Sequence, residues 1–289
     1  MTKDLRVFLL YNGDMNRVKY IVFDLDNTLL DSMKTIPSQS LRYLRELRNN
    51  TGIKLGIASG RTLRSYGAKG RKYHLNEIMD FLILNDGCDI YDNDRGSHYE
   101  YEFFNYQQAR EICLIFNKWE FANVIFIDDG DMYAEKYTED LKDTMARQGI
   151  DHFLNVSEGM IGKIKRCVVV FERSRQEEIR KIRLDNPVYG VRYLFSEGHL
   201  LDVLPQGVSK RNALERYLHS NGDDWDSVMF FGDGENDMEL IEKSGIGVAM
   251  KNAPERVRMI RDHVTEQDCD NEGCVRFLKD REDLWKQWK

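Results

Sequence analysis

Short apolar segments alternate with polar turns at both ends of the chain, and this pattern predicts alternating strands and helices. Residues 18–23 are rich in β-branched and aromatic side chains, which favours a strand. Leucines three residues apart over residues 38–51 predict a helix that begins at Ser38 and ends at Gly52. Residues 53–58 and 81–84 predict two further strands. Strands that alternate with helices in this way are typical of a parallel, doubly wound sheet.

The middle of the chain has a different pattern and predicts an inserted domain. The expected elements there are a hairpin around residues 92–96, a helix over 106–119 and strands over 124–127, 164–171 and 191–195. After Pro205 the first pattern returns, with helices from Lys210 and Asp237 and strands over 228–231 and 246–249. We therefore expect an α/β fold: a Rossmann-like doubly wound core over residues 1–87 and 205–289, with an α+β cap domain over residues 88–204.

Composition narrows the classes of partner. The chain has 289 residues, 42% of them hydrophobic, and a net charge of -7, so it is expected to fold and to lack the basic face that nucleic-acid binding requires. No apolar run approaches the roughly 20 residues that span a bilayer, and five cysteines are too few and too sparse for a disulfide framework. We expect a cytoplasmic protein that is a monomer or weak homo-oligomer. Residues 1–14 are expected to be either a peripheral arm or an extension upstream of the usual start at Met15.

Two carboxylates follow the first predicted strand directly. Asp24 and Asp26 stand two positions apart, a spacing that points both side chains the same way on extended backbone. Ligands of parallel sheets bind beyond the carboxyl ends of the strands. Two like charges held together need a cation or a shared proton, although a solvated turn with helix-capping carboxylates is an alternative interpretation.

Other strand ends carry matching chemistry. Asp233 and Asp237, with Asn236 between them, follow the strand over residues 228–231, and four carboxylates in one crevice favour a hard cation, Mg²⁺. Ser59 and Gly60 open a helix after another strand and offer a hydroxyl and free backbone N–H groups to a phosphate, and Lys210 adds a positive charge at a helix start. Together these residues indicate phosphoryl transfer.

Four segments resemble, in order and spacing, the motifs of the haloacid dehalogenase superfamily of phosphotransferases, and within it the Cof-type sugar-phosphatase-like group with a type II cap. The matching segments are Asp24-Leu25-Asp26-Asn27-Thr28, Ser59-Gly60-Arg61, Lys210 and Gly232-Asp233-Gly234-Glu235-Asn236-Asp237. One departure lies where the cap begins: family members often carry Asn-Gly-Ala, whereas this chain has Asp86-Gly87-Cys88. An acidic side chain there is unfavourable beside an anionic substrate unless it binds sugar hydroxyls.

The resemblance implies a role for each matching residue. Asp24 would attack phosphorus to form an aspartyl-phosphate, and Asp26 would protonate the leaving oxygen and then activate water. Ser59, Gly60, Lys210 and Asn236 would bind the transferring phosphoryl group, and Arg61 would either bind it or brace the loop. Mg²⁺ would be held by Asp24, the backbone carbonyl of Asp26, Asp233 and, through water, Asp237.

The function expected on these grounds is that of a Mg²⁺-dependent phosphoric monoester hydrolase. Its substrate would be a small phosphorylated metabolite, most simply a sugar phosphate. Three alternatives stay open: a phosphohexomutase-like enzyme, a specialised disaccharide-phosphate phosphatase, and a non-catalytic sensor of a phosphorylated ligand.

Overall fold

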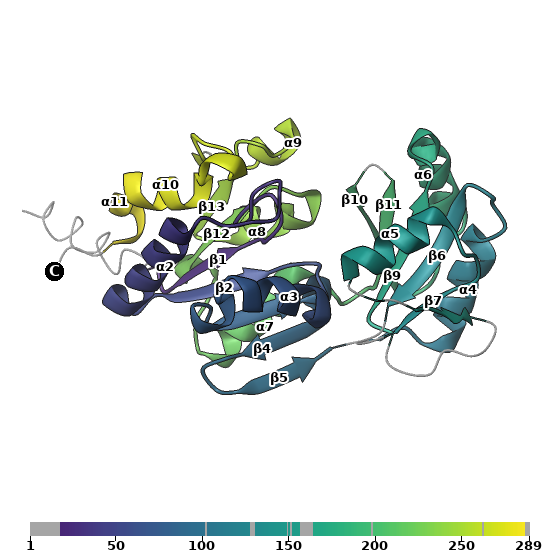
Figure 1. The fold of residues 1–289 in the computed structure, drawn as a ribbon, viewed down its shortest axis with the longest axis horizontal. Coiled ribbons are helices and arrows are strands. Elements are labelled where there is room, and N and C mark those ends of the chain that lie inside the picture. Colours follow the sequence, from purple (N-terminus) through teal and green to yellow (C-terminus); the bar gives the residue numbers. More distant parts are fainter. Residues whose placement is uncertain are drawn as a thin grey trace, which may run out of the picture.

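A computed structural model describes residues 18–101, 103–127, 131–148, 150, 152–156, 164–197, 199–261 and 263–286. The expected arm over residues 1–14 lies outside this part of the chain. The described residues form two sheets that lie apart along the longest axis of the molecule, each with its own helices (Figure 1). We call the first sheet with its helices the first lobe and the second sheet with its helices the second lobe.

The first lobe is built on an eight-stranded sheet in the order β14-β13-β12-β1-β2-β3-β4-β5. Its strands are β1 (Tyr20–Phe23), β2 (Lys54–Ala58), β3 (Phe81–Leu84), β4 (Asp89–Asp92), β5 (Ser97–Glu100), β12 (Val228–Gly232), β13 (Ile246–Ala249) and β14 (His263–Val264). The strands from β14 to β3 run parallel, and β4 and β5 add an antiparallel hairpin at the edge. The central strand β1 is apolar and buried throughout, as expected for a parallel strand covered on both faces.

Helices cover both faces of this sheet (Figure 1). The lobe contains α2 (Ser38–Thr51), α3 (Leu63–Lys72), α7 (Lys210–Ser220), α8 (Met238–Lys243), α9 (Glu255–Arg258), α10 (Gly273–Asp280) and α11 (Glu282–Trp285). The crossovers through α2 and α3 advance along the sheet in one direction and the crossover through α8 in the other, so right-handed connections place these helices on opposite faces. The expected doubly wound α/β core is confirmed.

The second lobe has a six-stranded sheet in the order β10-β11-β9-β6-β7-β8, antiparallel except for the last pair. Its elements are α4 (Tyr106–Phe116), β6 (Ala122–Ile127), β7 (Met132–Ala134), α5 (Glu139–Gln148), β8 (Leu154–Asn155), β9 (Arg166–Phe171), α6 (Gln176–Asp185), β10 (Val191–Glu197) and β11 (Leu200–Pro205). Apolar side chains of α4 and α6 pack on one face, and those of α5 pack on the other. This α+β arrangement is the inserted unit that the sequence predicted.

The edge hairpin differs from the expectation. We grouped residues 92–96 with the inserted segment, but β4 pairs with β3 and thereby extends the first sheet. The hairpin joins the first sheet because it continues directly from β3 through a tight turn at Asn85–Gly87, which places β4 next to β3. We therefore propose a domain division in which the hairpin belongs to the core and the cap spans residues 103–205.

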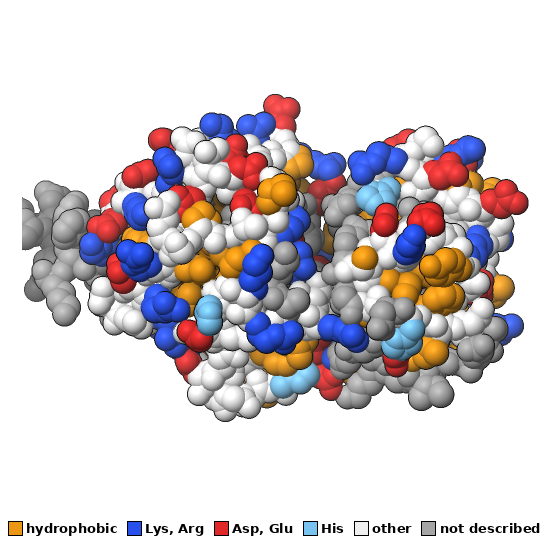
Figure 2. Space-filling model, viewed as in Figure 1, with side chains coloured by type: hydrophobic (Ala, Val, Ile, Leu, Met, Phe, Trp, Pro, Cys, Tyr) orange, Lys and Arg blue, Asp and Glu red, His pale blue; other side chains and the backbone are white. Residues whose placement is uncertain are grey.

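The surface is mixed in charge. On the face shown in Figure 2, Lys and Arg side chains are interspersed with Asp and Glu over both lobes, and the surface is hollowed between them. Among the described residues, no helix combines the length and the apolar character that crossing a membrane requires.

Candidate active site

The carboxyl ends of β1, β2 and β12 meet at a cavity between the two lobes, with a volume of about 550 Å³. Seven of the eight predicted site residues line it: Asp24, Asp26, Ser59, Gly60, Asp233, Asn236 and Asp237. The eighth, Lys210, is buried next to the cavity and contacts two of these carboxylates. The structure thus brings together all the residues that the sequence selected.

Lys210 joins two of the motifs through its ammonium group. It begins α7, whose first turn is capped by the side chain of Ser209. Its Nζ lies 2.7 Å from Asp24 Oδ1 and 2.8 Å from Asp237 Oδ1. Burial alone would lower the pKa of Lys210, but the carboxylates of Asp237 and Asp24 raise it, so the side chain stays charged. A permanent positive charge therefore stands beside the predicted nucleophile.

Asp24, Asp233 and Asp237 form a compact group of carboxylates. Each offers one oxygen, and these oxygens lie within 4.8 Å of one another. Burial raises the pKa of Asp24 well above its usual value, as do the charges of Asp237 and Asp233, although Lys210 opposes the shift. Burial and the charge of Asp237 also raise the pKa of Asp233 to about 6. Carboxylates that repel one another in this way are suited to bind a divalent cation that prefers oxygen ligands.

Asp237 is the most constrained member of this group. Its Oδ2 accepts hydrogen bonds from the backbone N–H groups of Asp233 (3.1 Å) and Gly234 (2.9 Å), while Oδ1 accepts from Lys210. Both oxygens of Asp237 therefore have protein donors. Thr28, the last residue of the first motif, donates to Asp233 Oδ1 at 3.0 Å and fixes that carboxylate.

Asp26 is held by cations. Arg61 donates two hydrogen bonds to it, from Nε at 2.6 Å and from Nη2 at 2.8 Å, and Lys34 Nζ lies 3.3 Å away. Burial would raise the pKa of Asp26, but Arg61 and Lys34 outweigh it and lower the pKa below the usual value. Arg61 also donates to Ser65, so in this arrangement it braces the loop and keeps Asp26 ionised.

The loop after β2 closes against the loop after β3. Ser59 is buried, and its Oγ accepts a hydrogen bond from the backbone N–H of Arg61 at 3.2 Å. A Cβ at Gly60 would lie 2.9 Å from the carboxylate of Asp86, so only glycine permits this approach. Asp86 is itself buried and accepts a hydrogen bond from Asn236 Nδ2 at 3.4 Å. Asp86 therefore packs against this loop, and it does not line the cavity.

A methyl group at Gly60 should disturb the site more than the fold. We expect Gly60→Ala to lower kcat/KM for phosphate release by about 100-fold, because the added Cβ would push the Ser59 loop away from Asp86. Gly67→Ala in α3 is the matched control, since a Cβ there meets only the flexible end of Arg71 at 3.3 Å. Steady-state kinetics and thermal unfolding of both variants test this, and equal kinetic losses in the two would contradict it.

A second acidic cluster is paired with a buried lysine. Asp89, His98 and Glu100 have the spacing of metal ligands, but the ammonium of Lys165 lies among them, 2.9 Å from Asp89 and 2.8 Å from Glu100. Lys165 is 1% exposed and precedes β9, so this ion-pair cluster ties the edge hairpin of the first lobe to the second. Its chemistry is that of a structural link rather than of a metal centre.

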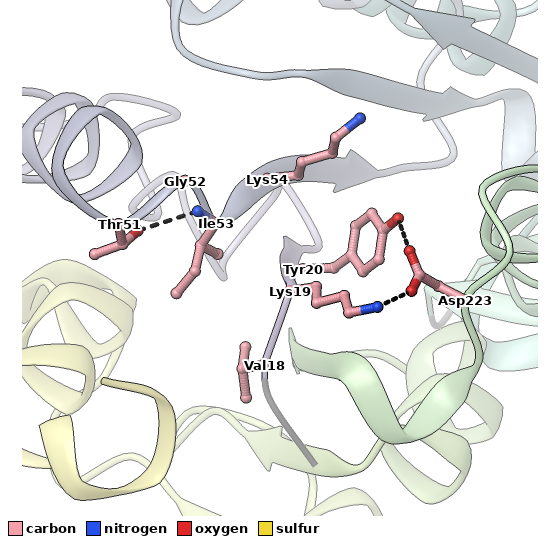
Figure 3. Close-up of a pocket in the computed structure, with 8 residues that line it drawn as sticks. All are labelled: Val18, Lys19, Tyr20, Thr51, Gly52, Ile53, Lys54 and Asp223. Carbon is pink, nitrogen blue, oxygen red and sulfur yellow. Dashed lines mark hydrogen bonds and ion pairs between the residues drawn. The ribbon is translucent and has the colours of Figure 1, made fainter. Parts of the chain in front are cut away.

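Another hollow lies at the opposite ends of β1 and β2 and encloses about 230 Å³ (Figure 3). Its acidic residue, Asp223, is paired with Lys19 and accepts a hydrogen bond from Tyr20 Oη at 2.6 Å. Parallel sheets carry their ligand sites at the carboxyl ends of the strands, and this hollow lies at the other ends. The cavity at the motifs is therefore the candidate site.

Several residues of the site were not predicted. Lys34 follows the first motif by several positions without any periodic signal, and Arg166 with Asp202 comes from strands of the second lobe. Their positions depend on pairing between strands that lie far apart in the chain, and a single sequence does not reveal such pairing. Thr28 is the last residue of the first motif, and its hydroxyl was the signal from which its place in the site could have been predicted.

Comparison with known proteins agrees with this geometry. The sequence model of the haloacid dehalogenase-like hydrolases matches residues 21–278. The chain is 25% identical over 272 residues to the 5-amino-6-(5-phospho-D-ribitylamino)uracil phosphatase YitU of Bacillus subtilis, covering 90% of this chain and 96% of YitU. It is 28% identical to an HMP-PP phosphatase of Yersinia pseudotuberculosis, covering 89% and 92%.

A solved haloacid dehalogenase-like hydrolase from Bacteroides thetaiotaomicron has the same fold, with a TM-score of 0.79 at 22% identity over 91% of this chain and 99% of that one. The expected enzyme class, a phosphatase-type hydrolase, is confirmed by the family match and by the names of these relatives. Since the family match runs from β1 to α10 and includes all four motifs, the chain belongs to the haloacid dehalogenase-like hydrolase family.

Proposed function

We propose that the chain is a Mg²⁺-dependent phosphatase that hydrolyses a small phosphorylated metabolite, most simply a sugar phosphate, through an aspartyl-phosphate on Asp24. The observation that carries this proposal is the buried contact of Asp24 with Lys210, 2.7 Å apart, beside two further carboxylates. A carboxylate nucleophile next to a fixed cation can attack phosphorus while the charge of the phosphoryl group is neutralised.

Each residue of the site has its own role in the proposed reaction. Asp24 forms a bond to phosphorus as the bond to the leaving alcohol breaks, and water then releases phosphate from Asp24. Ser59, the Gly60 loop, Lys210 and Asn236 orient the phosphoryl oxygens. Asp26, ionised beside Arg61, is ready to take a proton from the attacking water. Protonation of the leaving oxygen by Asp26 requires that its contact with Arg61 be broken first.

Asp24, Asp233, the backbone carbonyl of Asp26 and, through water, Asp237 would hold Mg²⁺. The donor set fits, because three carboxylate oxygens lie within 4.8 Å of one another in a mostly buried position. When bound, the ion supplies charge neutralisation to the phosphoryl oxygens. The second lobe covers the cavity and acts as the cap in this proposal, since its strands and α5 contribute part of the cavity wall.

Phosphate release from a panel of sugar phosphates and other small phosphomonoesters tests the proposal. We expect release that needs Mg²⁺ and stops when a chelator is added, because the carboxylates at the cavity would repel the substrate without the ion. Absence of release from every ester by a folded protein that binds Mg²⁺ would exclude the phosphatase activity. Isomerised sugar phosphate without release would support the mutase alternative instead.

A further inference from the structure

The turn that follows β3 is joined to the loop proposed to bind phosphate. Asn85 and Asp86 in this turn have φ values of 50° and 53°, a left-handed conformation that residues other than glycine seldom adopt. The backbone N–H of Asn85 donates to the carbonyl of Arg61 at 2.9 Å, and that of Asp86 donates to the carbonyl of Ser59 at 3.2 Å. The turn and the Ser59 loop are therefore fixed to each other at both ends of the loop.

The carboxylate of Asp86 lies behind the Ser59 loop. Its side chain is 5% exposed, and its Oδ1 accepts a hydrogen bond from Asn236 Nδ2 at 3.4 Å. Its Oδ2 is buried and accepts no hydrogen bond from any residue that the structure describes. Burial lowers the pKa of Lys210, and the carboxylates of Asp237 and Asp24 raise it. Asp86 adds to this rise in pKa, so its charge acts on the phosphate-binding lysine of the proposed function.

A cation of the second lobe lies next to that buried oxygen. Arg166 Nε is 3.9 Å from Asp86 Oδ2. Nε and Nη2 of Arg166 donate to Asp202 Oδ1 at 3.0 and 2.5 Å, and its Nη1 donates to the backbone carbonyl of Gly60. Asp202, on the neighbouring strand β11, is 2% exposed. Arg166 is thus fixed to the second lobe by Asp202 and contacts the first lobe at Gly60 and Asp86.

Separation of the two lobes would change the charge behind the phosphate loop. The contacts of Arg166 with Gly60 and Asp86 would break, whereas its contact with Asp202 would persist because both residues belong to the second lobe. Asp86 would then lack its cation, and its negative charge would repel a phosphoryl group in the Ser59 loop. Contact between the lobes and a phosphoryl group in the loop therefore favour each other, and by linkage each strengthens the other by the same factor.

We propose that Arg166 and Asp86 form a latch between the lobes and act as positioning residues, because Arg166 balances the charge of Asp86 when the lobes close and the Ser59 loop then accepts the phosphoryl group. This inference rests on the proposed function and adds a means by which the phosphoryl group of the substrate favours closure. Asp86 stands where members of the family often have asparagine. An asparagine there would lack the charge that Arg166 balances.

Binding of inorganic phosphate in the presence of Mg²⁺ tests this charge coupling. Calorimetric titration compares the wild type, Asp86→Asn, Arg166→Met and the double variant. We expect Arg166→Met alone to raise the Kd for phosphate about tenfold or more. In the Asp86→Asn background the same substitution should raise it by a factor that is smaller by about fivefold or more, since no charge is left to balance. Equal factors in the two backgrounds, or a wild type that binds no phosphate, would overturn the proposal.

Arg192→Met is the matched control for these titrations. Arg192 also joins the lobes, 3.6 Å from Glu239, yet it does not line the cavity. Because its ion pair is partly exposed, its loss should change the Kd for phosphate by less than about twofold in both backgrounds. A dependence on Asp86 as large as that of Arg166→Met would show that any cation between the lobes suffices, and it would overturn the assignment to Arg166.

The distance between the lobes tests the latch without phosphate and without hydrolysis. Spin labels on Tyr189→Cys in the second lobe and Met259→Cys in the first report this distance by pulsed electron paramagnetic resonance. Both positions are exposed, at 95% and 78%, and the five native cysteines are buried, so the labels attach selectively.

In this labelled protein we expect Arg166→Met and Asp86→Asn each to raise the population at longer distances by about twofold or more. The double variant should add little to the larger of the two effects, since both substitutions break one contact. Unchanged distance distributions in both single variants would overturn the latch. If the distributions change as expected and phosphate binding shows the coupling while no ester is hydrolysed, the latch stands and only the phosphatase activity fails.

Discussion

Asp24→Asn should lower kcat for phosphate release by about four orders of magnitude or more, because an amide cannot form the covalent bond to phosphorus. The substitution keeps the shape of a side chain that is buried at the end of β1 and hydrogen-bonded to Lys210. Burst and steady-state phosphate release with Mg²⁺ measure the loss. Retention of more than about 1% of the wild-type kcat would show that Asp24 is not the nucleophile.

The same variant should not unfold more easily. A carboxyl whose pKa is raised by folding binds its proton more tightly in the folded state, so the folded state loses stability when rising pH removes that proton. The pKa of Asp24 is raised by burial, by Asp237 and by Asp233. At neutral pH the neutral amide avoids this cost, and the free energy of unfolding of the metal-free protein should stay the same or rise. A large decrease would mean that the activity loss reflects misfolding.

The core of the fold and the centre of the site could be predicted because their signals are local. An apolar strand followed at once by Asp24 and Asp26, or by Asp233 and Asp237, specifies both the strand and the edge at which the carboxylates lie. Gly52 ends α2 in the left-handed conformation, with a φ of 73°, as the Thr51-Gly52 signal indicated. Parallel pairing then brings the strand ends together without further information.

The second lobe was less predictable because its important contacts are not local. The predicted strands omitted β11, since Asp202 interrupts its apolar run, yet that carboxylate is buried and pairs with Arg166 from β9. Helix α5 is polar in sequence, and among its described side chains Leu141 and Met145 are the ones in the apolar core. Asp86 contacts the Gly60 loop and Asn236 and does not line the cavity, a position that the sequence alone did not indicate. Contacts between segments far apart in the chain decide these positions.

Lys210→Met should damage both stability and activity. Removal of the ammonium leaves Asp24 and Asp237 buried without their cation, and we expect the free energy of unfolding to fall by about 3 kcal/mol. Phosphate release should fall about 100-fold or more, because a fixed charge beside the transferring group is lost. Lys54→Met is the control for loss of a lysine ion pair, since Lys54 is partly exposed, 3.1 Å from Asp94, and should cost less than about 1 kcal/mol.

A double variant shows whether the ammonium acts through these carboxylates. In Asp24→Asn/Lys210→Met one of the two unpaired carboxylates is gone, so the loss of stability should be smaller than in Lys210→Met alone by about 1 kcal/mol. Chemical denaturation of the wild type, both single variants and the double variant gives this coupling energy. If the two substitutions were simply additive, Lys210 would stabilise the fold by packing, and its charge would not balance Asp24. A measured coupling would instead tie the position of Lys210, the proposed phosphate-binding residue, to the ionisation of Asp24, the proposed nucleophile.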